Sequence, residues 1–260
     1  MPGEHLIYLT AFGETFADYA RKCIHTLRHP GLGNYGGPIL VYTGTAGDPA
    51  WRDPDRPGSA TETRRLMLPE GRDRGYWALR ARVLAGSLID HDAYDRIAYL
   101  DCDVLAQRDL SPLFEGPEAL RYHFEPWPLW TCQYSNAFLT SEEMREAEAT
   151  HRRSVNAGAF VVPGRLARHL FARWGALMDT TGDDVGTSDN PTPDQSALNA
   201  MILRGEIPAE PLPHGFVANP DLGMSYPEAR LFHFTGGRKL HPKGFMHRYR
   251  ELTAEPAPCA

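Results

Sequence analysis

The 260-residue sequence contains no apolar run that approaches the roughly 20 residues a membrane-spanning helix needs. It also has no basic segment ahead of its first apolar run, HLIYLTAF, which argues against a secretory signal peptide. Its four cysteines, Cys23, Cys102, Cys132 and Cys259, show no CxxC spacing, so we expect reduced thiols rather than a disulfide framework. Together these absences predict a cytoplasmic protein.

Positive charge is also scarce, because 27 Lys and Arg residues stand against 33 Asp and Glu residues, for a net charge of −6. This balance argues against sequence-independent binding to nucleic acid. Apolar residues make up 42% of the chain, which is enough to bury a core at this length. We find no internal repeat and no linker, and therefore expect one domain over residues 1–253 with a disordered tail at 254–260.

Strand-like and helix-like patterns alternate in the first hundred residues. Short apolar runs rich in β-branched and aromatic residues lie at 5–12, 38–44 and 96–100. Between them, apolar residues spaced three and four apart predict helices at 14–29 and 76–90. This order predicts an α/β fold with a mostly parallel sheet and helices on both faces. In such folds, ligands bind beyond the carboxyl ends of the strands.

The rest of the chain carries similar but less regular patterns. They predict a short strand at 64–69, a helical turn at 110–114, strands at 155–164 and 230–237, and helices at 165–180 and 193–205. Residues 115–153 combine several aromatics with a charged run and give no clear prediction.

Two aspartates directly follow the predicted strand at 96–100, in the stretch YLDCDVL. In an extended segment, residues two apart point to the same side, so Asp101 and Asp103 converge while Cys102 faces away. Adjacent carboxylates repel each other unless one is protonated or a cation lies between them. Taken alone, the pair is also compatible with a solvated turn whose aspartates cap the next segment. Its position at the ligand-binding edge favours a divalent cation, Mg²⁺ or Mn²⁺.

A second polar cluster, HFTGGRK, follows the last predicted strand. His233 offers a nitrogen ligand, and Gly236 allows the backbone to approach a ligand closely. Arg238 and Lys239 carry charge that suits a diphosphate. A structural histidine followed by solvated basic residues would also account for this stretch. HFTGGRK therefore indicates a ligand site only in combination with the aspartates.

Four stretches in this order, YLDCDVL, VNAGAFVV, PDQSALN and HFTGGRK, resemble the retaining glycosyltransferases of the glycogenin and bacterial lipopolysaccharide galactosyltransferase type, glycosyltransferase family 8. The resemblance covers most of the chain. It includes the family's His-x-x-Gly-x-x-Lys pattern at His233, Gly236 and Lys239, although Leu-His-Pro stands where the family has Pro-Trp. The resemblance implies the GT-A fold and the transfer of a sugar from a nucleotide.

By this resemblance, Asp101, Asp103 and His233 bind Mn²⁺ (or Mg²⁺), and Lys239 contacts the donor's diphosphate together with the backbone at Gly236. Negative charge grows on the nucleoside diphosphate as it leaves the sugar. A metal and a lysine aimed at that charge stabilise the transition state more than the ground state.

The resemblance also assigns residues to the donor sugar and its phosphates. The helix at 76–90 is expected to supply a basic contact, for which Arg82 fits best and Arg80 is the alternative. Helical positions two apart diverge by about 200°, so we expect only one of them to face the ligand. Asn156 matches the family's Asn-x-Gly turn, where the asparagine meets donor hydroxyls, and Gly158 completes that turn.

Asp194 and Gln195 match the pair that begins a helix beside the reacting face, although Asp194 alone would also serve as a helix N-cap. Gln195 stands where the family has its debated nucleophile or stabiliser. Because glutamine is a poor nucleophile, we favour a same-face displacement in which the leaving phosphate helps to deprotonate the acceptor. Leu9, Thr10 and Ala11 match the uridine-binding stretch, so UDP is the expected carrier.

The segment between the paired aspartates and the Asn-x-Gly turn is longer than in compact family members. We expect residues 127–153 to be an insertion or an acceptor lid. Trp127, Trp130 and Tyr134 either form a platform for an acceptor sugar or pack within the lid itself. Glu125 is a candidate for an acidic contact to the donor sugar.

The expected function is a metal-dependent, retaining transfer of a hexose from a UDP-sugar to a hydroxyl acceptor, with UDP-glucose or UDP-galactose favoured. The sequence leaves the acceptor open among a glycan, a lipid-linked sugar and a small molecule. The locally basic stretch 236–250 is compatible with a solvated helix face and with peripheral contact to a membrane. The alternatives are a sugar-phosphate nucleotidyltransferase, disfavoured because TAFGETFADY lacks a basic Gly-rich loop, and a non-catalytic nucleotide-sugar-binding protein.

Overall fold

A large sheet and a small sheet lie side by side in the protein. The computed structural model describes residues 4–44, 61–67, 74–132, 134–180, 193–235 and 244–254, the side chains of 74–79 excepted. The large sheet contains β1 (His5–Thr10), β2 (Ile39–Thr43), β3 (Thr61–Arg65), β4 (Arg96–Leu100), β6 (Leu120–Pro128), β7 (Arg153–Pro163) and β8 (Ala209–Pro211). The small sheet contains β5 (Val104–Ala106), β9 (Val217–Ala218) and β10 (Leu231–His233).

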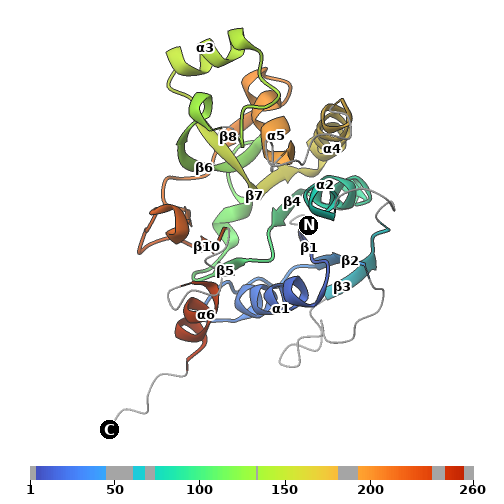
Figure 1. Cartoon of the computed structure of the whole chain (residues 1–260). Coiled ribbons are helices and arrows are strands. Elements are labelled where there is room, and N and C mark those ends of the chain that lie inside the picture. Colours follow the sequence, from blue (N-terminus) through green and yellow to red (C-terminus); the bar gives the residue numbers. More distant parts are fainter. Residues whose placement is uncertain are drawn as a thin grey trace.

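The strand order is β3-β2-β1-β4-β7-β6-β8 in the large sheet and β5-β10-β9 in the small one (Figure 1). Neighbouring strands from β3 to β4 are parallel, and β6 is parallel to β8. Only β7, which lies between β4 and β6, runs in the opposite direction within this sheet. The α/β class and the mostly parallel sheet that the sequence predicts are therefore confirmed.

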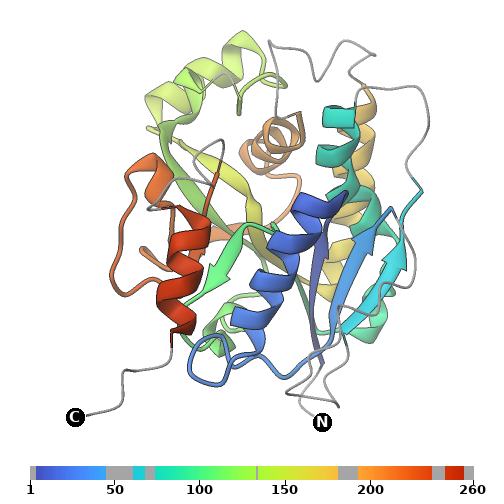
Figure 2. The same ribbon diagram turned by 60° about the horizontal axis from the view of Figure 1, so that its bottom comes forward.

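Helices cover both faces of the large sheet. The helices of the described residues are α1 (Glu14–Arg28), α2 (Arg74–Ser87), α3 (Ser141–Ala149), α4 (Gly164–Asp179), α5 (Pro193–Leu203) and α6 (Phe245–Thr253), of which all except α3 contribute to this cover. Helix α1 lies on one face with α6 next to it, whereas α2, α4 and α5 lie on the other (Figures 1 and 2). Two apolar cores result, one on each side of the sheet.

The period-2 pattern of the strands explains these two cores. In β1, Leu6 and Tyr8 face the α2 and α4 side, whereas Ile7 and Leu9 face α1. All four side chains are fully buried, as expected for a central strand that is covered on both faces. This double burial is why the strand-like runs of the sequence are almost continuously apolar.

The register of two strand pairs brings distant segments to the end of β4. Strand β7 pairs with β4 so that Leu100 lies opposite Ala159. After two intervening aspartates, the chain enters β5, where Val104 lies opposite His233 of β10. The carboxyl end of β4 is therefore the junction between the two sheets.

Several elements differ from the sequence-based expectation. The short strand expected at 64–69 is β3, which begins earlier at Thr61 and ends at Arg65. Strand β6 and helix α3 were not predicted, because the prolines of β6 hide its pattern and α3 buries only Ala147. The tail expected at 254–260 lies outside the described residues except for Ala254. In the part of the chain that is described, no helix is long and apolar enough to cross a membrane.

Two glycines of helix α4 give a matched test of its packing against the rest of the fold. A Cβ on Gly164 would overlap the backbone carbonyl oxygens of Tyr94 and His91, whereas a Cβ on Gly175 would make an ordinary contact of 3.6 Å with Val83. We expect Gly164→Ala to lower the free energy of unfolding by about 1–3 kcal/mol. We expect Gly175→Ala to raise it by about 0.5–1 kcal/mol. Urea denaturation measures both, and changes of the same sign would contradict this packing.

Candidate functional site

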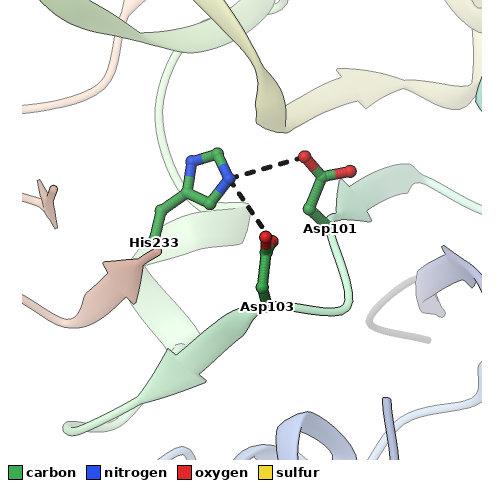
Figure 3. A group of neighbouring side chains, drawn as sticks. All are labelled: Asp101, Asp103 and His233. Carbon is green, nitrogen blue, oxygen red and sulfur yellow. Dashed lines mark ion pairs between the residues drawn. The ribbon is translucent and has the colours of Figure 1, made fainter. Parts of the chain in front are cut away.

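Three side chains from two distant segments meet where the two sheets join. Asp101 follows β4, Asp103 precedes β5, and His233 ends β10 (Figure 3). His233 Nε2 lies 3.4 Å from Asp101 Oδ2 and 3.5 Å from Asp103 Oδ1. One ligand atom from each of the three residues lies within 4.8 Å of the others. The structure thus brings the Asp-x-Asp pair and the late histidine into one cluster, which we call the acidic triad.

The donor atoms of the acidic triad suit a divalent cation. Carboxylate oxygens with one imidazole nitrogen are ligands that Mn²⁺ accepts readily, and Mg²⁺ also prefers the oxygens. The neighbouring strand β7 can lie this close to the triad only because residue 158 is a glycine. A Cβ on Gly158 would overlap the His233 ring and lie 2.5 Å from Asp101 Oδ2. Within the described ranges, no other group of three His, Cys, Asp or Glu side chains has this ligand geometry.

The protonation of the acidic triad follows from its mutual contacts. Burial disfavours the charged form of Asp101, but Arg82 and the hydrogen bonds from His233 and Tyr99 lower its pKa overall. Burial also disfavours protonated His233, yet its contacts with both aspartates raise its pKa from 6.5 to about 9. In the metal-free protein, His233 is therefore protonated at neutral pH, and a divalent cation would have to displace that proton.

Arg82 of α2 lies against the same triad. Its Nη2 is 3.2 Å from Asp101 Oδ1, its Nε is 3.0 Å from Asp194 Oδ2, and its Nη1 donates to the Ala157 carbonyl at 2.7 Å. Although burial opposes its charge, these carboxylates raise the pKa of Arg82 further above its usual range. Arg80 instead forms an ion pair at the end of α4. Of the two arginines considered from the sequence, Arg82 is the one that faces the site.

Helix α5 brings Asp194 and Gln195 to the same place, and both side chains are buried. Burial raises the pKa of Asp194 despite the opposing charge of Arg82. Gln195 Oε1 accepts from the Ala157 backbone N–H at 3.3 Å, and its Nε2 donates to Ser135 Oγ at 2.9 Å. The amide of Gln195 is therefore held at both ends.

Asn156 of β7 and Glu125 of β6 form the adjoining part of the wall. Asn156 Oδ1 accepts from the Gly158 backbone N–H at 2.7 Å and from His123 Nε2 at 3.1 Å. Asn156 Nδ2 donates to Glu125 Oε1 at 2.9 Å. Burial, reinforced by the charge on His233, lowers the pKa of His123 to about 3 and keeps this imidazole neutral.

These groups line one cavity of 360 Å³. Every residue named above for the site contributes to its lining except His123, Ala157, Ser135 and Arg80. Of the expected uridine-binding stretch, Thr10 lines the cavity, whereas the side chains of Leu9 and Ala11 are buried in the core on the α1 side. Gly236 and Lys239 lie outside the described residues.

The cavity also contains residues that the sequence reasoning left out. They are Phe12, Phe16, Tyr99 and Thr235. Cys102 lines the cavity too, so the expectation that it faces away from the aspartates was wrong, because residues 101–103 form a turn and not an extended segment. Tyr99 had a readable signal, since it precedes Asp101 by two positions in a strand, and its hydroxyl donates to Asp101 Oδ1 at 2.6 Å.

The three aromatics of the expected lid do not behave alike. Tyr134 lines the cavity and is half-exposed. The ring of Trp130 lies near His151, with 6.2 Å between the ring centroids. Trp127 is 47% exposed and does not line the cavity. Only Tyr134 of this trio therefore reaches the site, and no joint stacking platform is formed there by the three rings.

Comparison with known proteins gives a fold match. A scan against protein-family models and a search of curated protein sequences found no match. Among solved structures, the galactosyltransferase LgtC in complex with donor and acceptor sugar analogues aligns with a TM-score of 0.63 and 18% identity, over 96% of this chain and 97% of LgtC. An active-site mutant of LgtC, with glutamate in place of a glutamine, aligns with a TM-score of 0.64 and 17% identity over the same shares.

The chain has the GT-A fold. The resemblance inferred from the four sequence stretches is therefore confirmed at the level of the fold. The match extends over 96% of this chain and 97% of LgtC.

The raised pKa of His233 makes the stability of the metal-free protein depend on pH. Its protonated ring pairs with Asp101 and Asp103, so this contribution is fully present below pH 6.5 and is lost as the pH rises through about 9. We expect the free energy of unfolding of the wild type, relative to His233→Gln, to fall across this window. Urea denaturation in EDTA at a series of pH values measures the difference, and a constant difference would contradict the ion pairs.

The absence of a side chain at Gly158 provides a direct test of the acidic triad as a cation site. We expect Gly158→Ala to weaken Mn²⁺ binding by about tenfold or more, because its Cβ would displace His233 and Asp101 from each other. Electron paramagnetic resonance of free Mn²⁺ measures the affinity. Gly175→Ala is the matched control and should leave Mn²⁺ binding unchanged. An unaltered affinity in Gly158→Ala would show that the cation binds elsewhere.

Proposed function

We propose that the protein is a metal-dependent, retaining glycosyltransferase that moves a hexose from a UDP-sugar, UDP-glucose or UDP-galactose by preference, to a hydroxyl acceptor. One observation carries the proposal: the acidic triad opens into the same cavity as Arg82, Asp194, Gln195 and Asn156. The GT-A fold supports it, as does the similarity in fold to LgtC, a galactosyltransferase solved in complex with donor and acceptor sugar analogues.

In this proposal, Asp101, Asp103 and His233 hold Mn²⁺ or Mg²⁺ next to the diphosphate of the donor. The bound cation supplies positive charge to the nucleoside diphosphate as it leaves. Lys239 and the backbone at Gly236 are assigned to the same diphosphate. Their residue types suit that role. The ammonium group of a lysine attracts phosphate oxygens, and a glycine lets the backbone N–H approach them without a side chain in the way.

Arg82 is assigned to the junction between the diphosphate and the sugar. Its contacts with Asp101 on one side and Asp194 on the other support that position. Because Arg82 is buried and paired, it is oriented before a ligand arrives, and little reorganisation is needed when negative charge develops. Asn156 is assigned to donor hydroxyls, with Gly158 leaving space for the ligand, and Asp194 is assigned to the reacting face.

Gln195 is assigned to the reacting face, where it stabilises rather than attacks. Its amide is bonded at both ends, which holds it still, and an amide oxygen is a poor nucleophile. We therefore keep the same-face displacement, in which the departing phosphate helps to remove the acceptor proton. Retention of configuration in this proposal follows the family resemblance.

The uracil is assigned to the stretch Leu9, Thr10 and Ala11 at the end of β1, where backbone groups would read its edge. The acceptor is assigned to the side of the cavity where Tyr134 lies, with residues 127–153 as its lid. The half-exposed Tyr134 ring suits the apolar face of a sugar.

Incubation with UDP-sugars and Mn²⁺ tests the proposal. We expect slow hydrolysis to UDP with UDP-glucose or UDP-galactose, because a glycosyltransferase without its acceptor transfers sugar to water. Asp103→Asn should lower the rate by about 100-fold, since a carboxylate aimed at the cation is lost. The matched control is Asp109→Asn in the same segment, where the carboxylate accepts a hydrogen bond from Ser111 outside the cavity.

Three results would contradict the proposal in distinguishable ways. Turnover of a nucleoside triphosphate with a sugar phosphate would indicate a nucleotidyltransferase. Tight UDP-sugar binding without turnover, with a broad panel of acceptors, would indicate a binding protein. Equal rates in Asp103→Asn and Asp109→Asn would exclude the acidic triad from the reaction.

A further inference from the structure

Behind the cavity wall, His123 contacts two residues of the site at once. This histidine is buried on β6 and does not line the cavity. Its Nε2 lies 3.1 Å from Asn156 Oδ1. Its ring also meets the ring of His233 edge to face, with 5.7 Å between centroids and an interplanar angle of 76°. His123 therefore connects the sugar side of the cavity with the acidic triad.

The direction of the hydrogen bond to Asn156 is determined by its other partners. The Gly158 backbone N–H can only donate, and it donates to Asn156 Oδ1 at 2.7 Å. Glu125 Oε1 faces the amide nitrogen of Asn156 at 2.9 Å. Oδ1 is thus an acceptor, so His123 carries its hydrogen on Nε2. These three contacts hold the Asn156 amide in one orientation at the cavity wall.

The second contact of His123 is with the ring of His233, whose Nδ1 lacks, among the described residues, the hydrogen bond that would usually orient a metal-binding histidine. Metal-ligating histidines are usually held by a hydrogen bond from their second ring nitrogen. His233 Nδ1 is buried and has no such partner among the described residues. The contacts beside its ring include the edge-to-face contact with His123 and the close approach of Gly158.

We propose that His123 is a positioning residue with two separable tasks. Its Nε2–H orients the Asn156 amide toward the donor sugar, and its ring orients the His233 imidazole toward the cation. The inference rests on the proposed function, which supplies the sugar and the cation, and His123 touches neither of them.

Two substitutions separate the tasks. His123→Phe keeps a flat ring against His233 but has no donor for Asn156, whereas His123→Gln keeps an N–H donor but has no ring. We expect His123→Phe to raise the Kd for UDP-glucose or UDP-galactose about 3–10-fold at saturating Mn²⁺, with the Kd for UDP alone unchanged. We expect His123→Gln to raise the Kd for Mn²⁺ by a similar factor, about 3–10-fold, with the UDP-sugar Kd at saturating Mn²⁺ unchanged.

Calorimetry measures the nucleotide affinities and electron paramagnetic resonance the Mn²⁺ affinity, after thermal melts establish that both variants fold. A crossed pattern supports the proposal, because a merely structural histidine would affect both ligands in both variants. Equal losses of both ligands in both variants, or no loss in either, would overturn it.

One readout needs no ligand. A long-range ¹⁵N–¹H correlation spectrum of the metal-free wild type, assigned with His123→Gln, should show His123 as the Nε2–H tautomer. The Nδ1–H tautomer would overturn the contact with Asn156. If the wild type binds Mn²⁺ but no UDP-sugar, the proposed function fails, while the tautomer and the Mn²⁺ affinities of the two variants still decide the role of His123.

Discussion

The ion pairs that join Asp101, Asp103, Asp194, Arg82 and His233 are the constraint on which the rest of the site depends. Buried carboxylates need compensating charge, because each ion removed from water loses several kcal/mol of solvation. In the metal-free protein, Arg82 and protonated His233 bring two positive charges to a cluster of three aspartates. Under the proposed function, a divalent cation would replace the His233 proton and add one further positive charge to the cluster. Binding of the cation would therefore improve the compensation of the carboxylates.

The topology explains how residues 130 positions apart in the chain become neighbours. Strand β4 belongs to the large sheet and β5 to the small one, so the chain leaves one sheet and enters the other within the Asp-x-Asp stretch. The pairing of Val104 with His233 then fixes the histidine opposite this step. Strand β7 borders the triad as well, because the Asp101 backbone N–H donates to the Gly158 carbonyl at 2.7 Å. Since Gly158 has no side chain, its backbone can lie directly against the triad. His233 is thus held within a strand ladder, and the two aspartates stand in a short turn whose ends are fixed by β4 and β5.

The parts that could be predicted from the sequence are those with a strong period or a fixed spacing. The central strands are apolar on both faces, and the aspartates lie two apart at a strand end, so the sheet and the convergence of the pair were readable. Helical geometry also indicated that only one of Arg80 and Arg82 would face the site, and the resemblance favoured Arg82. Strand β6 was not readable, because Pro126 and Pro128 interrupt its pattern. His123 lies on that strand, so its place behind the cavity wall was hidden as well, whereas Glu125 was already a candidate from the resemblance and lines the cavity. Helix α3 did carry a signal, the capping box of Thr140 and Glu143, but its polar composition offered no apolar face to support it.

The two sides of the cavity differ in how their side chains are held. Asp101, Asn156 and His233 stand on or next to strands whose register admits one arrangement. Tyr134 lies between η4 (Leu129–Thr131) and α3, where its carbonyl accepts from Ser196 Oγ at 2.9 Å, while its ring is half-exposed at the cavity. A substitution at Tyr134 would change the shape of the cavity without changing the charge of the ion-pair network. Under the proposed function, the transfer chemistry depends on the strand ends and the acceptor preference on the segment between β6 and α3.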